Sequence, residues 1–110
     1  GEMHGAAYLR FSRDTTAMFT TTETPFQIGR AEVFRDGNDV ALVACGLLVW
    51  EAILAAQELE KRHGIQARVI NCHTIKPIDS ATLVQAAREC GAVVTAEEHQ
   101  VHGGLGGAVA

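Results

Sequence analysis

Polar and glycine residues that could do chemistry gather near the end of the chain. Glu97, Glu98 and His99 directly follow an apolar run, and Gly103-Gly104-Leu105-Gly106-Gly107 comes soon after. A glycine-rich turn between a strand and a helix is where doubly wound folds bind nucleotide phosphates. The spacing fits neither G-x-G-x-x-G nor a P-loop, because no Lys-Ser/Thr pair follows the glycines. The pattern therefore favours a tight turn that lets backbone segments approach closely.

The same stretch can also be read as a metal cluster, because His99 and His102 lie three residues apart beside two glutamates. Histidines at this spacing need a helix or a shaped loop to converge on one ion, and the glycines next to them argue against such rigidity. We expect instead a polar loop at the carboxyl end of a strand. Its members are Glu97, Glu98, His99, Gly103 and Gly104. The pattern leaves open whether this loop binds a ligand or a neighbouring subunit.

Arg13 is a second candidate for chemistry. It follows Ala7–Phe11, which could form a short strand in which Arg10 shares a face with Tyr8. An arginine at the end of a strand is well placed for a phosphate or carboxylate, because its planar fork matches either group bidentately. From the pattern alone, a solvated surface charge is the favoured interpretation of Arg13.

Apolar patterning predicts the strands that must position these residues. Arg30–Phe34 is predicted to be a short strand, and the turn Asp36-Gly37 after it predicts a hairpin. Val40–Cys45 is a continuous apolar run, which is typical of a strand buried on both faces, and Ala67–Asn71 is predicted to be a second buried strand. Ala92–Ala96 is a further strand that leads into the polar loop.

Two helices alternate with these strands. Apolar residues recur at helical spacing from Val49 to Leu59, and Lys61-Arg62-His63-Gly64 is a helix stop. Asp79 or Ser80 can cap a second helix that runs up to Gly91, and Ala108–Ala110 has the pattern of the first turn of another. This alternation predicts an α/β fold with a parallel sheet and helices on both faces. Such a sheet needs a final helix and strand to cover its last edge, so we expect a fragment.

Composition excludes several classes of protein. The 110 residues allow one domain, and a formal charge of −4 with scattered basic residues leaves no footprint for nucleic acid or an anionic membrane. No apolar run approaches the ~20 residues that span a bilayer, and the first residues do not form a signal peptide. Cys45, Cys72 and Cys90 lie in apolar stretches without CxxC spacing, which suits buried thiols in a reducing compartment. A cytoplasmic protein is expected.

Five segments, taken together, resemble the transketolase family. In chain order they are Leu9–Arg13, Phe26–Val33, Asp39–Gly46 with Glu51-Ala52 after it, His73–Asp79, and Glu97–His99 through to Gly103–Gly106. Each motif alone is modest, but five in order, spread from Tyr8 to Ala110, are specific. Deoxyxylulose-phosphate synthases and the β subunits of 2-oxoacid dehydrogenases have similar strands. The motifs Thr-Ile-Lys-Pro and Glu-Glu-His resemble those of transketolase more closely, particularly those of separately encoded C-terminal subunits.

The resemblance implies a domain organisation and a more exact fold. Residues 1–25 would be the end of a pyrimidine-binding domain plus a linker, and residues 26–110 an incomplete transketolase-like C-terminal domain. In place of the hairpin, the family puts Arg30–Phe34 antiparallel beside Ala67–Asn71, with Val40–Cys45 central and Ala92–Ala96 beyond. The expected fold is a three-layer α/β/α sheet, mostly parallel with one antiparallel edge strand, truncated before its last helix and strand.

The resemblance also implies a function. The parent enzyme would be a transferase of the pentose phosphate pathway that moves a two-carbon ketol unit between phosphorylated sugars with thiamine diphosphate and Mg²⁺. Arg13 stands where transketolases hold the sugar phosphate. The cofactor groups would lie outside this chain, so the chain alone should bind neither and be inactive. Its partners would be the remaining domains or an N-terminal subunit, in a homodimer or heterotetramer. The competing class is a non-catalytic interaction module.

Overall fold

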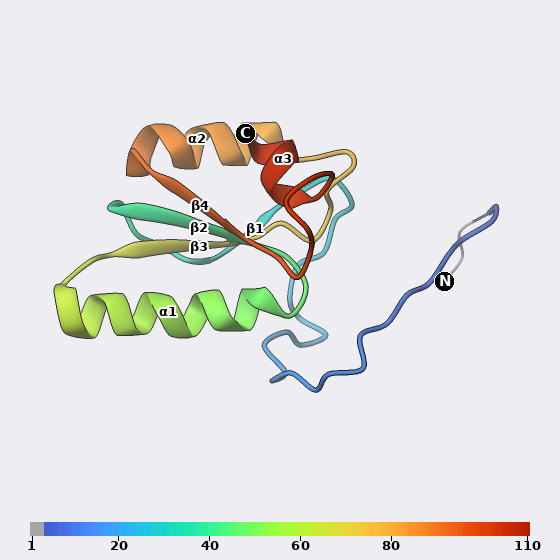
Figure 1. Ribbon diagram of the computed structural model, residues 1–110, viewed down its shortest axis with the longest axis horizontal. Coiled ribbons are helices and arrows are strands. Elements are labelled where there is room, and N and C mark those ends of the chain that lie inside the picture. Colours follow the sequence, from blue (N-terminus) through green and yellow to red (C-terminus); the bar gives the residue numbers. More distant parts are fainter. Residues whose placement is uncertain (1–3) are drawn as a thin grey trace.

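The computed structural model describes residues 4–110, and within that range a four-stranded sheet lies between two layers of helix (Figure 1). α1 covers one face, while α2 and α3 lie on the other. The elements in chain order are β1 (Glu32–Arg35), β2 (Val40–Ala44), α1 (Leu48–His63), β3 (Ala67–Asn71), α2 (Ser80–Cys90), β4 (Val93–Ala96) and α3 (Leu105–Val109). The predicted three-layer α/β/α architecture is confirmed.

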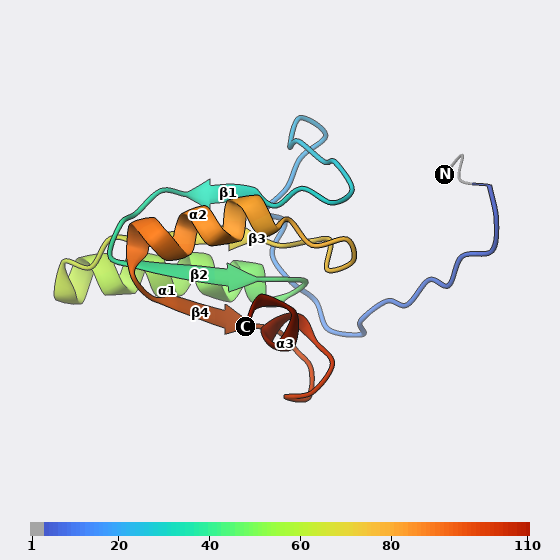
Figure 2. The ribbon, with the colours of Figure 1, turned by 90° about the horizontal axis from the view of Figure 1, so that it is seen from above.

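The strands lie in the order β1-β3-β2-β4, as the family resemblance implied. β1 pairs antiparallel with β3, whereas β2 is parallel to both β3 and β4, as the arrow directions in Figure 2 show. The hairpin that Asp36-Gly37 suggested is wrong, because β1 and β2 are not neighbours. Instead the turn crosses the start of β3. A Cβ on the buried Gly37 would lie 2.7 Å from the Arg68 nitrogen, so this position accepts no side chain.

β2 and β3 supply both hydrophobic cores, because successive side chains on a strand point to opposite faces. Val43 and Ile70 belong to the core beneath α2 and α3. Ala44 and Val69, one residue further along or back, belong to the core against α1. In Figure 1, α1 lies on one side of the sheet, and α2 and α3 lie on the other. This double burial explains why Val40–Ala44 is a continuous apolar run in the sequence.

The helix ends lie where the sequence placed them. Gly64 and Gly91 follow α1 and α2 with φ of 68° and 69°, a left-handed conformation that glycine adopts without a steric penalty. Asp79 is the residue that caps α2: its Oδ1 accepts a hydrogen bond from the Thr82 N–H at 3.1 Å. The third helix, in contrast, begins at Leu105 rather than Ala108, so the last three residues of the glycine-rich run are helical.

The segment before β1 differs from expectation. Ala7–Phe11 forms no strand, and Tyr8 and Phe11 are 90% and 82% exposed. A strand needs a neighbour to satisfy its backbone, and the described part of the chain offers this segment none. Thr20–Pro25, at the end of the segment that was expected to include a linker, contains a turn in which the Thr24 N–H donates to the Thr21 carbonyl at 3.1 Å.

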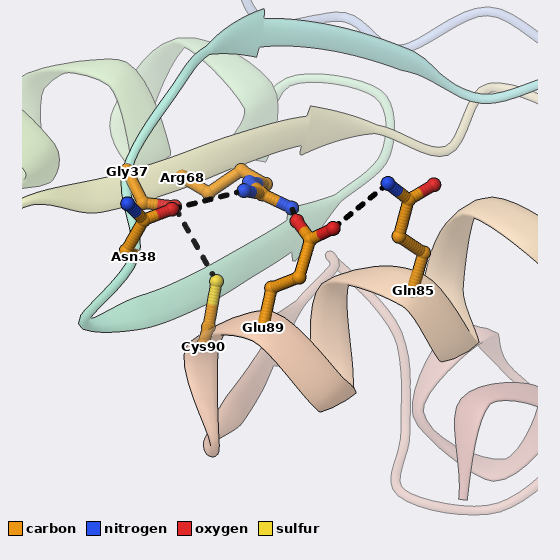
Figure 3. A network of polar contacts seen from close by, with 6 residues as sticks. All are labelled: Gly37, Asn38, Arg68, Gln85, Glu89 and Cys90. Carbon is orange, nitrogen blue, oxygen red and sulfur yellow. Dashed lines mark hydrogen bonds and ion pairs between the residues drawn. The ribbon is translucent and has the colours of Figure 1, made fainter.

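A polar network ties the carboxyl end of α2 to the sheet (Figure 3). Arg68 of β3 donates to Glu89 of α2 at 2.5 Å and to Asn38 at 3.2 Å. Gln85 and Arg68 together lower the pKa of Glu89, because both donate to its carboxylate. The Cys90 thiol contacts the Gly37 carbonyl at 3.4 Å, so α2 is also attached to the β1–β2 turn. Because Arg68 makes these contacts within the domain, its role is structural.

Asp79 joins two segments that are far apart in the chain. Its Oδ2 accepts from the Ala31 N–H at 3.0 Å and from the Thr82 hydroxyl at 2.7 Å. The Ala31 N–H is the main reason that the pKa of Asp79 lies below its ordinary value, with the two Thr82 donors adding to the effect. The carboxylate therefore both begins α2 and attaches the chain that enters β1.

We predict that Asp79→Ala lowers the free energy of unfolding by about 0.5–2 kcal/mol, the usual loss on removing an N-cap. The folded-state pKa of Asp79 is depressed, so its contribution is complete above the unfolded-state pKa and is lost as pH falls through the folded-state value. The difference between wild type and variant should therefore shrink from about pH 4 downward. Urea denaturation of this chain at several pH values measures it.

Ser80→Ala is the matched control, because Ser80 is the neighbouring residue that could have been the cap. It is the exposed first residue of α2. We expect Ser80→Ala to change stability little at any pH. Equal losses for both variants would show that the Asp79 carboxylate does not carry the cap.

Candidate functional site

The parallel strands β2, β3 and β4 all end at one edge of the sheet (Figure 2). Open α/β sheets bind ligands beyond the carboxyl ends of their strands, so this edge is the first place to look for a site. The residues that follow the strands there are Cys45 after β2, Cys72 and His73 after β3, and Glu97 and Glu98 after β4. The edge therefore carries thiol, imidazole and carboxylate groups.

Glu97 is occupied by the protein's own backbone. Its carboxylate accepts from the Gly106 N–H at 3.1 Å and from the Leu105 N–H, and these lie in the first turn of α3. The Leu105 bond is the main reason that the pKa of Glu97 lies below its ordinary value. A carboxylate at this position satisfies donors that a helix start leaves unpaired. Glu97 thus joins the end of β4 to α3.

The Glu97 carboxylate lies so close to Gly104 that position 104 has no room for a side chain. Gly104 is buried, and a Cβ at this position would fall on the Glu97 carboxylate. Gly103, just before it, has φ of +82°, which turns the chain back toward the sheet. The structure therefore brings Glu97, Gly103 and Gly104 together. The glycine run forms a tight turn with close backbone approach, which is the interpretation that the sequence pattern favoured.

The other two members of the polar loop face different surroundings. Glu98 and His99 are exposed, and His99 Nδ1 lies 2.8 Å from the Gln100 carbonyl oxygen. His102 is also exposed. Within residues 4–110, no three His, Cys, Asp or Glu side chains come together as a metal site would require. Glu98 and His99 remain candidates for contact with a ligand or another subunit.

His73 is a residue at this edge that the sequence analysis did not single out. Its Nδ1 lies 2.9 Å from the Thr74 hydroxyl, and the Phe26 ring covers it at a centroid distance of 4.5 Å. Its Nε2 is buried and has no hydrogen-bond partner in the described part of the chain. The sequence did carry one signal for His73, which is its position just after a buried strand. The contact with Phe26 joins segments that are distant in the sequence, so no local pattern could have predicted it.

The two cysteines at this edge are side by side. Ala44 pairs with Asn71, and the Cys72 N–H donates to the Ala44 carbonyl at 2.8 Å, so Cys45 and Cys72 follow in register. Burial raises the pKa of both thiols. Thiols with raised pKa react slowly, because the thiolate is the nucleophile. Cys72 is a small apolar side chain in the core under α2, as expected, whereas Cys45 is half-buried and packs against that core.

Arg13 does not join this edge. It lies exposed in the N-terminal segment, which leaves the body of the domain (Figure 1). The structure therefore brings Glu97 to Gly103 and Gly104, but it separates all three from Arg13.

Among residues 4–110, no helix is long and apolar enough to cross a membrane.

We predict that Gly104→Ala displaces the Glu97 carboxylate, because the added methyl occupies its place. The pKa of Glu97, measured by NMR titration of its carboxyl carbon, should rise toward its ordinary value. The Gly106 amide should exchange with solvent about two- to tenfold faster, the factor for losing one ordinary hydrogen bond.

Gly107→Ala is the matched control, since nothing lies within 4 Å of a Cβ at this position of the same helix. It should leave the pKa of Glu97 unchanged. An unchanged pKa in Gly104→Ala as well would contradict the cap.

Comparison with known proteins gives a consistent result. Residues 29–110 match the family described as transketolase, C-terminal domain. A 6-deoxy-6-sulfo-D-fructose transketolase subunit, SqwH, of Clostridium sp. (strain MSTE9) is 43% identical over 106 residues, which are 96% of this chain and 33% of that protein. A 1-deoxy-D-xylulose-5-phosphate synthase of Thermomicrobium roseum is 54% identical over 82 residues, 74% of this chain and 13% of that protein.

A solved structure agrees with the fold. The chain described as "Split gene transketolase, inactive beta4 tetramer" superposes with a TM-score of 0.84 and 46% identity, over 88% of this chain and 32% of that one. This chain thus spans a third or less of the length of these relatives. The matched family, the strand order and the long alignments together establish that the chain belongs to the transketolase family, in which residues 29–110 correspond to the C-terminal domain.

Proposed function

We propose that this chain is the C-terminal part of a thiamine-diphosphate-dependent transketolase that transfers a two-carbon ketol unit between phosphorylated sugars. The observation that carries the proposal is the near-complete alignment with a transketolase subunit, which at 106 residues extends beyond the C-terminal domain match and includes position 13. Residues 1–25 would then be the end of the pyrimidine-binding domain and its linker, and residues 26–110 the C-terminal domain.

Arg13 is the residue of this chain that we propose for substrate binding. Its guanidinium is exposed, and none of the ion pairs among residues 4–110 uses it. Arginine holds a phosphate through two parallel hydrogen bonds, which fixes the orientation of the sugar as well as its charge. Arg13 would thus hold the sugar phosphate and leave the reacting carbons to groups elsewhere in the enzyme.

The cofactor site is proposed to lie in other parts of the enzyme. The residues described here offer no cluster of metal ligands that would suit the Mg²⁺ of a diphosphate, and Glu97 is already bound to backbone N–H groups. When bound, thiamine diphosphate supplies the carbanion chemistry of ketol transfer. We assign no step of that chemistry to this chain, and we expect the chain alone to be inactive.

The proposed partners are the remaining transketolase domains or an N-terminal subunit, in a homodimer or heterotetramer. A separate subunit is supported by the names of the relatives, one of which is a transketolase subunit and another a split-gene transketolase tetramer. We place Glu98 and His99 on the surface available to such a partner, since both are exposed. A cytoplasmic location fits the three free cysteines.

A deoxyxylulose-phosphate synthase is the second candidate. The identity of 54% to the Thermomicrobium roseum enzyme, over 82 residues, supports this candidate. Both activities would use a phosphorylated sugar, so Arg13 would have the same role in each. An assay of the intact enzyme with a ketose phosphate as donor and an aldose phosphate as acceptor decides, because the ketol transfer proposed for transketolase needs both.

We predict that Arg13→Ala in the intact enzyme lowers kcat/KM for phosphorylated sugars about ten- to a hundredfold, the factor for losing one charge-assisted hydrogen bond. Non-phosphorylated acceptors should be nearly unaffected, because they offer the guanidinium nothing to hold. Arg13→Lys should recover part of the loss, since an ammonium keeps the charge but not the fork.

Arg10→Ala is the control from the same segment, since Arg10 is also exposed. It should show no selectivity between phosphorylated and non-phosphorylated acceptors. If Arg13→Ala reduced activity equally on both, Arg13 would support the fold and the proposed site would be wrong.

A further inference from the structure

The chain between Arg13 and β1 is attached to the domain at several points. Residues 19–31, here called the strap, precede β1 and contain no helix or strand. At its start, the Phe19 ring packs edge-on against Phe34 of β1, with centroids 6.1 Å apart and planes at 65°. Phe19 also lies against the buried core under α1. The strap is therefore docked on the domain from its first residue.

Three further contacts attach the strap to the connection between β3 and α2. The Phe26 ring lies on His73 at 4.5 Å, and a Cβ on Gly29 would lie 3.3 Å from the Pro77 ring. The Ala31 N–H donates to Asp79 Oδ2 at 3.0 Å. Together with the contact of Phe19, the thirteen residues of the strap thus make four contacts with the domain, which we call anchors. No single one is strong, but each limits where the others can move.

Internal turns fix the shape of the strap between its anchors. The Thr21 N–H donates to the Thr24 hydroxyl at 2.9 Å, while the Thr24 N–H returns to the Thr21 carbonyl. A second turn is closed by the Arg30 N–H and the Gln27 carbonyl at 3.0 Å, with Gly29 at φ +83°. A backbone held by its own turns loses less entropy on docking than a flexible chain would.

We propose that the docked strap positions Arg13 for the sugar phosphate, so that the C-terminal domain acts on substrate binding through Phe19 and Phe26. This inference rests on the proposed function. Only five residues separate Arg13 from Phe19, so an anchor at Phe19 confines Arg13 to within about 20 Å. An undocked strap would let the segment occupy many positions. Because apparent affinity falls in proportion to the population of the binding-competent state, undocking would weaken phosphate binding.

The first experiment measures docking without reference to activity. In the intact enzyme, hydrogen exchange of backbone amides in residues 19–31 should be about two- to tenfold faster in Phe26→Ala, the factor for losing one aromatic contact. Phe26 is 70% exposed, so this substitution leaves the core alone. Ile28→Ala is the matched control: Ile28 is 59% exposed, lies on the same strap and makes none of the four anchoring contacts. Exchange in α1 and α2 should stay the same in both variants.

The second experiment measures the consequence for substrate. Phe26→Ala should raise KM for a phosphorylated acceptor about twofold or more, while KM for a non-phosphorylated acceptor and kcat for both stay near wild type. Phe19→Ala/Phe26→Ala, which removes both aromatic anchors, should go further in the same direction. Phe26→Tyr keeps the stacked ring and should behave as wild type.

The outcomes separate this inference from the proposed function. If Phe26→Ala frees the strap but KM for the phosphorylated acceptor is unchanged, the positioning role is wrong, and a selective loss in Arg13→Ala would leave the proposed function standing. Unchanged exchange in Phe26→Ala, or equal losses on both acceptors, would also overturn the inference. If Arg13→Ala itself shows no selectivity, the proposed site fails and the positioning role fails with it.

Discussion

The parallel pairing of β2 with β3 places every other element of this domain. Both strands bury side chains on both faces, with Val43 and Ile70 toward one core and Ala44 and Val69 toward the other. A slip of one residue would exchange the two sets and expose both cores. The same register brings the ends of β2 and β3 level, so Cys45 and His73 reach the same edge of the sheet as Glu97.

Two carboxylates extend this order to the connections. Asp79 accepts N–H donors from the start of α2 and from Ala31, and Glu97 accepts them from the start of α3. In each case the carboxylate accepts a backbone donor that the start of a helix cannot satisfy itself, and Asp79 also accepts the Ala31 N–H from the chain that enters β1. Backbone N–H donors, chiefly Ala31 for Asp79 and Leu105 for Glu97, are the main reason that the pKa of each carboxyl lies below its ordinary value. Glu97 therefore serves structure here, although its place after β4 is typical of ligand sites.

The family assignment and the geometry divide the roles within the chain. The folded domain holds Glu97 and His73 in internal contacts, while Arg13, which the transketolase resemblance singles out, lies in the segment before the domain. That segment has exposed aromatic side chains and no sheet to join within residues 4–110. The strap connects the two regions, and its aromatic anchors on Phe34 and His73 are the physical link between the domain and the proposed substrate contact.

Local chemistry in the sequence determined the elements, and tertiary contact decided how they are used. Glycine after α1 and α2, and Asp79 before α2, predicted helix ends correctly, because caps depend on a few adjacent residues. Patterning found the strands but not their order, which came from the family resemblance. Asp36-Gly37 misled because Gly37 is required by the backbone of β3, thirty residues away. Ala7–Phe11 has a strand pattern, yet a strand forms only against a partner. Glu97 and Phe26 became a cap and an anchor only where folding placed Gly106 and His73 beside them, since no local pattern encodes a contact between distant segments.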